Sequence, residues 1–122
     1  MQSQAWNDLY LTRLAQYYDV VRTANFLLLG TVAIILFADT AGAELAIAAL
    51  VVGAGLFGIL GGDRALSNLT ALRTDLDKEG RDTNWGKSLQ SAPLTVFRAR
   101  HGIIHAAIVA TQLMLLFGAH GT

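Results

Sequence analysis

The sequence contains no cysteine and a single proline, and only 15% of its 122 residues are charged. The absence of cysteine excludes disulfides, thiolate metal sites and a cysteine nucleophile. An average soluble domain is about 25% charged, whereas 53% of the residues here are hydrophobic. A chain of this length cannot hide so much apolar surface in a soluble core. The composition therefore indicates burial in lipid or against partner proteins.

Signatures of catalysis are missing as well. The sequence has no HExxH, no GxSxG and no phosphate-binding GxxxxGK[ST] motif, and no apolar run contains a pair of carboxylates. We therefore expect no enzymatic activity and no catalytic residue. No chain of ionisable residues crosses an apolar run, which argues against an ion or proton pump. The formal net charge of zero argues against a nucleic-acid partner.

One cluster of acidic residues lies between the second and third apolar runs. Acidic and basic residues alternate through positions 73–82, which is typical of a solvated helix face. A divalent-metal site is the lesser alternative, and we expect no metal ligand there. The acidic residues are Asp75, Asp77, Glu79 and Asp82.

Three apolar runs are present, at about 24–38, 45–62 and 102–119. A membrane-spanning helix needs about 20 apolar residues, and the short first run reaches this length if Arg22 extends toward the interface. In lipid these runs must be helices, because unpaired backbone groups are too costly there. The connector 39–44 predicts a tight hairpin between the first two. Pro93 suits the first turn of the third helix, at 94–119.

The positions of the cations predict an orientation. All nine Lys and Arg residues precede the first run or lie between the second and third runs, while the connector 39–44 carries two acids and no base. Basic loops stay in the cytoplasm during insertion. We expect a bacterial cytoplasmic (inner) membrane protein with its N-terminus and residues 63–101 inside, and with residues 39–44 and the C-terminus on the opposite side.

Two further helices are expected on the cytoplasmic side. Residues 3–22 show a helical period with an aromatic-rich apolar face, which suits the membrane surface or a second helix. Residues 63–80 form the other helix, with an apolar seam at Ala65, Leu69, Leu72 and Leu76. These two helices either pair or lie on lipid. The second run and 63–80 form one continuous rod or bend at Gly61-Gly62.

Small residues recur along the second run. Ala54, Gly58 and Gly62 are spaced by four, and Gly53 lies beside them. Such a stripe lets another helix approach closely. It indicates either an interface with a partner or a second copy, or packing within the same chain.

Polar residues near the middle of the runs predict a contact between helices. Thr31 lies halfway along the first run, and Thr111 and Gln112 lie halfway along the third. A hydrogen bond between these helices is the favoured interpretation, and it would contribute roughly 0.5–2 kcal/mol. The alternative is the polar lining of a pore formed by several copies.

The histidines are the candidates for binding a cofactor. His101 and His105 share one face of the third helix, with Arg98 near it and Asn25 at a similar depth. Imidazole can bind a quinone carbonyl or ligate the metal of haem or a chlorophyll-type pigment. The competing interpretation is that His101 lies among the headgroups and His105 bonds Asn25 or a backbone carbonyl. Haem with two histidine ligands would require a dimer that shares His105. Haem, a chlorophyll-type pigment or a quinone is possible, and the sequence requires none of them.

The predicted fold is an all-α integral membrane protein in a single domain, 1–122, divided as 3–22, 24–62, 63–93 and 94–119. The first functional hypothesis is a non-catalytic subunit of a larger assembly, such as an energy-transducing complex, that positions partners or a cofactor. The second is a homo-oligomeric channel or membrane-perturbing effector. The third is a haem-, pigment- or quinone-binding subunit that uses His105. The expected partners are lipid, other membrane subunits and copies of the chain.

Overall fold

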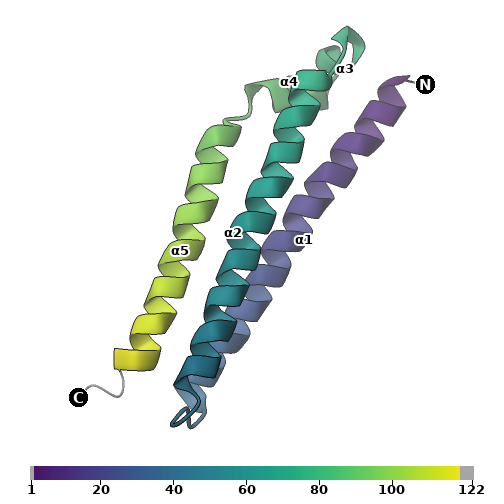
Figure 1. Ribbon diagram of the computed structural model, residues 1–122. Helices are drawn as coiled ribbons and strands as arrows, with labels where there is room; N and C mark the ends of the chain where they lie inside the picture. Colours follow the sequence, from purple (N-terminus) through teal and green to yellow (C-terminus); the bar gives the residue numbers. More distant parts are fainter. Residues whose placement is uncertain (1, 119–122) are drawn as a thin grey trace.

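The computed structural model describes residues 2–118, which form five helices and no strand. Three long helices run side by side: α1 (Gln2–Phe37), α2 (Glu44–Asp75) and α5 (Leu94–Gly118). The short helices α3 (Lys78–Asp82) and α4 (Asn84–Ser91) cover the end of the bundle where the N-terminus lies (Figure 1). All three long helices are long and apolar enough to cross a membrane. The expected all-α fold with three such helices is confirmed.

The first two long helices are longer than a bilayer requires. With 36 and 32 residues, α1 and α2 extend for about 54 and about 48 Å, against a hydrocarbon core of about 30 Å. The expected division between 3–22 and 24–38 does not exist, because α1 runs through it unbroken. Neither helix contains a proline or a stop signal that would end it there. The continuous rod was also the outcome for α2, since Gly61-Gly62 lies within it.

The segment that follows α2 differs from the prediction. We expected a helix over residues 63–80, but α2 ends at Asp75 and two short helices follow. The side chain of Asp77 accepts a hydrogen bond from the Gly80 amide at 2.8 Å and caps α3. The hydroxyl of Thr83 accepts from the Gly86 amide at 3.0 Å and caps α4. The expected end of the third helix at residue 119, and the C-terminal tail, lie outside the described residues.

The N-terminal half of α1 packs against the end of α2 rather than lying free. Leu66, Leu69 and Leu72 of α2 are buried in a cluster against aromatic residues of α1 and against α4. Tyr10 stacks on Trp85, with ring centroids 5.1 Å apart. We call this group the cap cluster: Leu66, Leu69, Leu72, Leu76, Leu89 and Leu94, with Trp6, Tyr10, Leu14, Tyr17, Trp85 and Ala92 packed on it.

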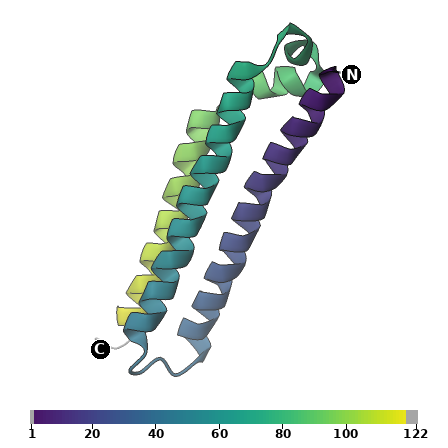
Figure 2. The ribbon, with the colours of Figure 1, turned by 45° about the vertical axis from the view of Figure 1, so that its right-hand side comes forward.

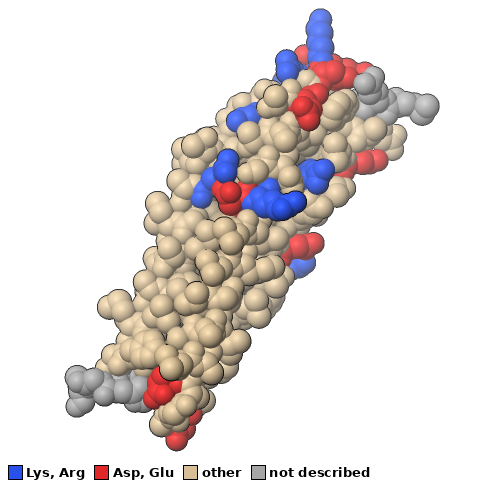
Figure 3. Space-filling view, in the orientation of Figure 1, with Lys and Arg blue, Asp and Glu red and all other residues tan. Residues whose placement is uncertain are grey.

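Charge is divided between the two ends of the molecule. On the face shown in Figure 3, the Lys and Arg side chains lie in the upper part, whereas the lower end shows only acidic side chains. Two ion pairs mark the lower edge of the cationic region: Arg22–Asp19 at 2.6 Å and Arg98–Asp63 at 2.7 Å. Asp63 lies about 28 Å along α2 from Glu44. The apolar belt between the two ends therefore matches the thickness of a bilayer core.

Candidate functional site

The three long helices do not contact one another equally. α2 packs along both α1 and α5, whereas α1 and α5 touch each other much less. Figure 2, turned from Figure 1, shows α2 between α5 and α1 in that view, with the three long helices running side by side. The candidate sites therefore lie on two seams: the glycine-rich face of α2 and the loosely packed boundary between α1 and α5.

Glycines on α2 allow α5 to approach closely. A Cβ atom on Gly58 would lie 2.8 Å from Cδ2 of His105 and 2.9 Å from Cβ of Ala24. A Cβ on Gly62 would overlap the His101 ring, and one on Gly55 would overlap Val109. Much of the small-residue stripe is therefore used for packing within the chain.

Gly53 differs from the rest of that stripe. Ala54 is buried, as are Gly58 and Gly62, but Gly53 is exposed and a Cβ built there meets no atom within 4 Å. The same is true of Gly30 on α1. Both glycines line a groove of about 540 Å³ between α1 and α2. We call it the α1/α2 groove; its other lining residues are Phe26, Leu27, Thr31, Ile34, Ala49, Leu50, Ala54 and Phe57.

A polar bridge joins α1 to α5 in the apolar belt. The Thr31 hydroxyl donates to Oε1 of Gln112 at 2.5 Å, and Nε2 of Gln112 donates to the Leu28 carbonyl at 2.8 Å. Thr31 and Gln112 are both buried. Thr111 is exposed and donates to Ala107 of its own helix, so it does not join the bridge. Because both ends of the Gln112 amide are used inside the chain, this geometry favours a packing role over a pore lining.

Both imidazoles bond to helix backbone. Nε2 of His101 lies 2.6 Å from the Gly58 carbonyl, to which it donates across the α2/α5 interface. Nδ1 of His105 lies 3.0 Å from the His101 carbonyl. Donation there places the ring proton on Nδ1, so Nε2 is an acceptor, and it has no hydrogen-bond partner within residues 2–118.

The surroundings of His105 do not fit a macrocycle. Its Cδ2–Nε2 edge faces Gly58, beside Ala24, at the contact distances given above. A haem or chlorophyll-type ring on Nε2 would require α2 to move away from α5. The structure therefore gives no room for metal ligation by His105 in this packing.

The four predicted cofactor residues are only partly brought together. Asn25, His101 and His105 line one hollow of about 320 Å³ between α1 and α5. Asn25 is exposed and forms no hydrogen bond with His105 among the described residues. Arg98 does not line this hollow, because it points to Asp63 of α2. Arg100 lines it instead, a residue that helical spacing from Phe97 and Ile104 would have indicated.

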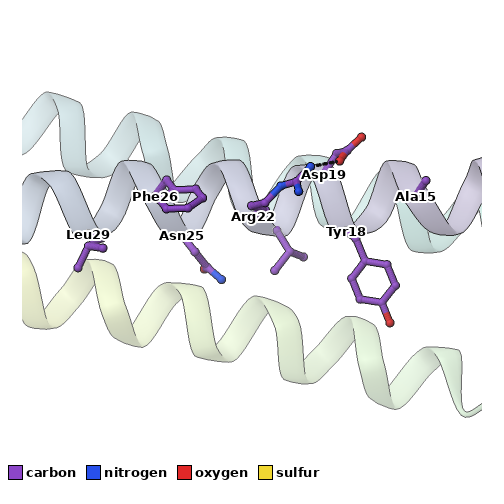
Figure 4. A pocket seen from close by; sticks show the side chains of 8 residues that line it. Ala15, Tyr18, Asp19, Arg22, Asn25, Phe26 and Leu29 are labelled. Carbon is purple, nitrogen blue, oxygen red and sulfur yellow. Dashed lines mark hydrogen bonds and ion pairs between the residues drawn. The ribbon is translucent and has the colours of Figure 1, made fainter.

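A second hollow continues the first along the same seam. It has a volume of about 640 Å³ and shares Asn25 and Ile104 with the smaller one. Figure 4 shows a neighbouring pocket lined by α1 alone, in which Tyr18, Asn25 and Leu29 point toward α5, while the Arg22–Asp19 pair lies on the other side of α1. We call the two joined hollows the α1/α5 groove. Their residues are Tyr17, Val21, Asn25, Leu28, Leu29, Val32, Phe97, Arg100, His101, Ile104, His105, Ala107, Ile108, Thr111, Gln112 and Leu115.

A comparison of this sequence and fold with known proteins found no match among family models, curated proteins or solved structures.

Proposed function

We propose that this chain is a non-catalytic integral membrane subunit that packs side by side with other membrane helices in a larger assembly. The proposal places its cation-rich end on the cytoplasmic side of the membrane. The observation that carries it is the α1/α2 groove, in which Gly30 and Gly53 lie open at the surface of the apolar belt.

The shape of the α1/α2 groove suits a helix better than it suits scattered lipid contacts. Its lining combines the small residues Gly30, Ala49 and Gly53 with large apolar side chains such as Phe26 and Phe57. Helices associate in lipid through close packing, because lipid tails are as apolar as leucine. Small residues beside large apolar side chains allow such packing.

The hydrogen bonds that polar side chains of the apolar belt form between helices support a packing role. Thr31 and Gln112 join α1 to α5, and His101 joins α5 to α2. These side chains hold the helices together and do not converge on a common reacting centre. They also leave the channel alternative without the inward-facing amide on which it was based.

Native extraction tests the proposal. In a mild detergent we expect a particle much larger than the 13.0 kDa chain. Gly53→Leu should release the chain from it, because the new side chain occupies the groove, while a Cβ built at Gly53 meets no atom within 4 Å. Gly102→Leu is the matched control, since a Cβ there also meets no atom but lies outside the groove. A lone monomer, or a particle that survives both Gly53→Leu and Gly30→Leu, would contradict the proposal.

A further inference from the structure

The α1/α5 groove is polar at one end and apolar along the rest. Arg100, Tyr17 and His101 line the hollow at the cationic end, with Asn25 at the junction of the two hollows. Beyond Asn25 the lining is mainly aliphatic as far as Leu115. A ligand that fits this gradient carries a polar head and a long apolar tail.

The polar end of the groove carries a positive charge. Arg22 and Arg98 each pair with an acid, Asp19 and Asp63. Arg100 is exposed and has no hydrogen bond or ion pair among residues 2–118. A free guanidinium at the mouth of the groove favours an anionic head, and guanidinium groups match the geometry of phosphate oxygens.

The depth of this cation also matches a lipid phosphate. Arg100 lies about 27 Å along α5 from Gly118, near the edge of a hydrocarbon core about 30 Å thick. Basic pockets between membrane helices are known sites for anionic lipid headgroups. Tyr17 and Asn25, which line the same hollow, also carry hydrogen-bond donors.

We propose that the α1/α5 groove binds an anionic phospholipid, with its phosphate at Arg100 and one acyl chain along the aliphatic part toward Leu115. A neutral amphiphile such as a quinone would leave Arg100 without a counter-charge. This inference goes beyond the proposed function and does not depend on it, because the α1/α2 groove lies on a different seam.

Native mass spectrometry of the delipidated chain tests this inference. Phosphatidylglycerol and phosphatidylcholine with identical acyl chains are added back, and lipid adducts are counted. We expect a several-fold preference for phosphatidylglycerol that Arg100→Gln abolishes. The matched control is Arg64→Gln, because Arg64 is also exposed near the interface but does not line the groove.

A second pair of variants tests the acyl-chain part. Ala107 lines the groove and Ala106 does not, and both are exposed. Ala107→Trp should abolish the lipid adducts of both phospholipids, whereas Ala106→Trp should leave these adducts unchanged. Three results would overturn the inference: equal binding of the two lipids, an effect of Arg64→Gln as large as that of Arg100→Gln, or a stoichiometric quinone extracted equally from wild type and Arg100→Gln.

Discussion

Gln112 joins two helices that otherwise share little surface. Its amide accepts from Thr31 and donates to the Leu28 carbonyl, both on α1. In hydrocarbon an unpaired amide has no water to replace its partners. This residue therefore fixes the position of α1 against α5 at one level of the apolar belt.

Replacing Gln112 by Leu should destabilise the fold by about 0.5–2 kcal/mol, because the bridge to α1 is lost. Thr111→Val should change stability by less than about 0.5 kcal/mol, since Thr111 bonds only within α5 and is exposed. Unfolding in detergent, followed by circular dichroism, measures both. Equal effects of the two variants would refute the bridging role.

The depth of a residue along a helix can be predicted from sequence, but the rotation of the helix about its own axis is harder to predict. Thr31 and Gln112 were placed at the same level because the rise per residue is fixed. Which of two adjacent residues faces a neighbouring helix depends on packing, so the sequence predicts both Thr111 and Gln112 as candidates for the contact with Thr31. The same limit led to Arg98 in place of Arg100, because the pairing of Arg98 with Asp63 is a contact between helices.

At the scale of elements, the boundaries of the apolar runs and the ends of the helices fall at different residues. The composition of α1 changes near Arg22, where the apolar run begins, and we read this as a boundary between two helices. The backbone has no reason to break there, and α1 continues. The sequence did not predict α4 because its eight residues make only about two turns and include Gly86, a residue typical of turns. The capping side chain of Thr83 was its local signal.

The cap cluster should depend on the buried leucines of α2. Leu72→Ala should destabilise this region by about 2–5 kcal/mol, because a cavity replaces a buried side chain. Leu11→Ala on α1 is the control, since Leu11 is 52% exposed and its loss should cost less than about 1 kcal/mol. Hydrogen exchange should then rise in residues 84–91 for Leu72→Ala alone. Unchanged exchange there would show that α4 is held by other contacts.

At the scale of the whole molecule, the separation of charge predicts the orientation. The chain has no cysteine, so an introduced cysteine is its single thiol. Ala41→Cys and Lys87→Cys place exposed thiols at opposite ends of the apolar belt. In intact cells, a membrane-impermeant maleimide should label Ala41→Cys, and it should label Lys87→Cys after the membrane is opened. The reverse pattern would invert the proposed topology.

The unequal contacts of α2 have a consequence for the order of assembly. Because α5 packs mainly on α2 and much less on α1, it can dock only after α2 is in place. The chain is made from its N-terminus, so α1 and α2 can form their hairpin before α5 is complete. We therefore expect biogenesis in two stages, in which the last helix joins a preformed pair and the Thr31–Gln112 bond closes at the end.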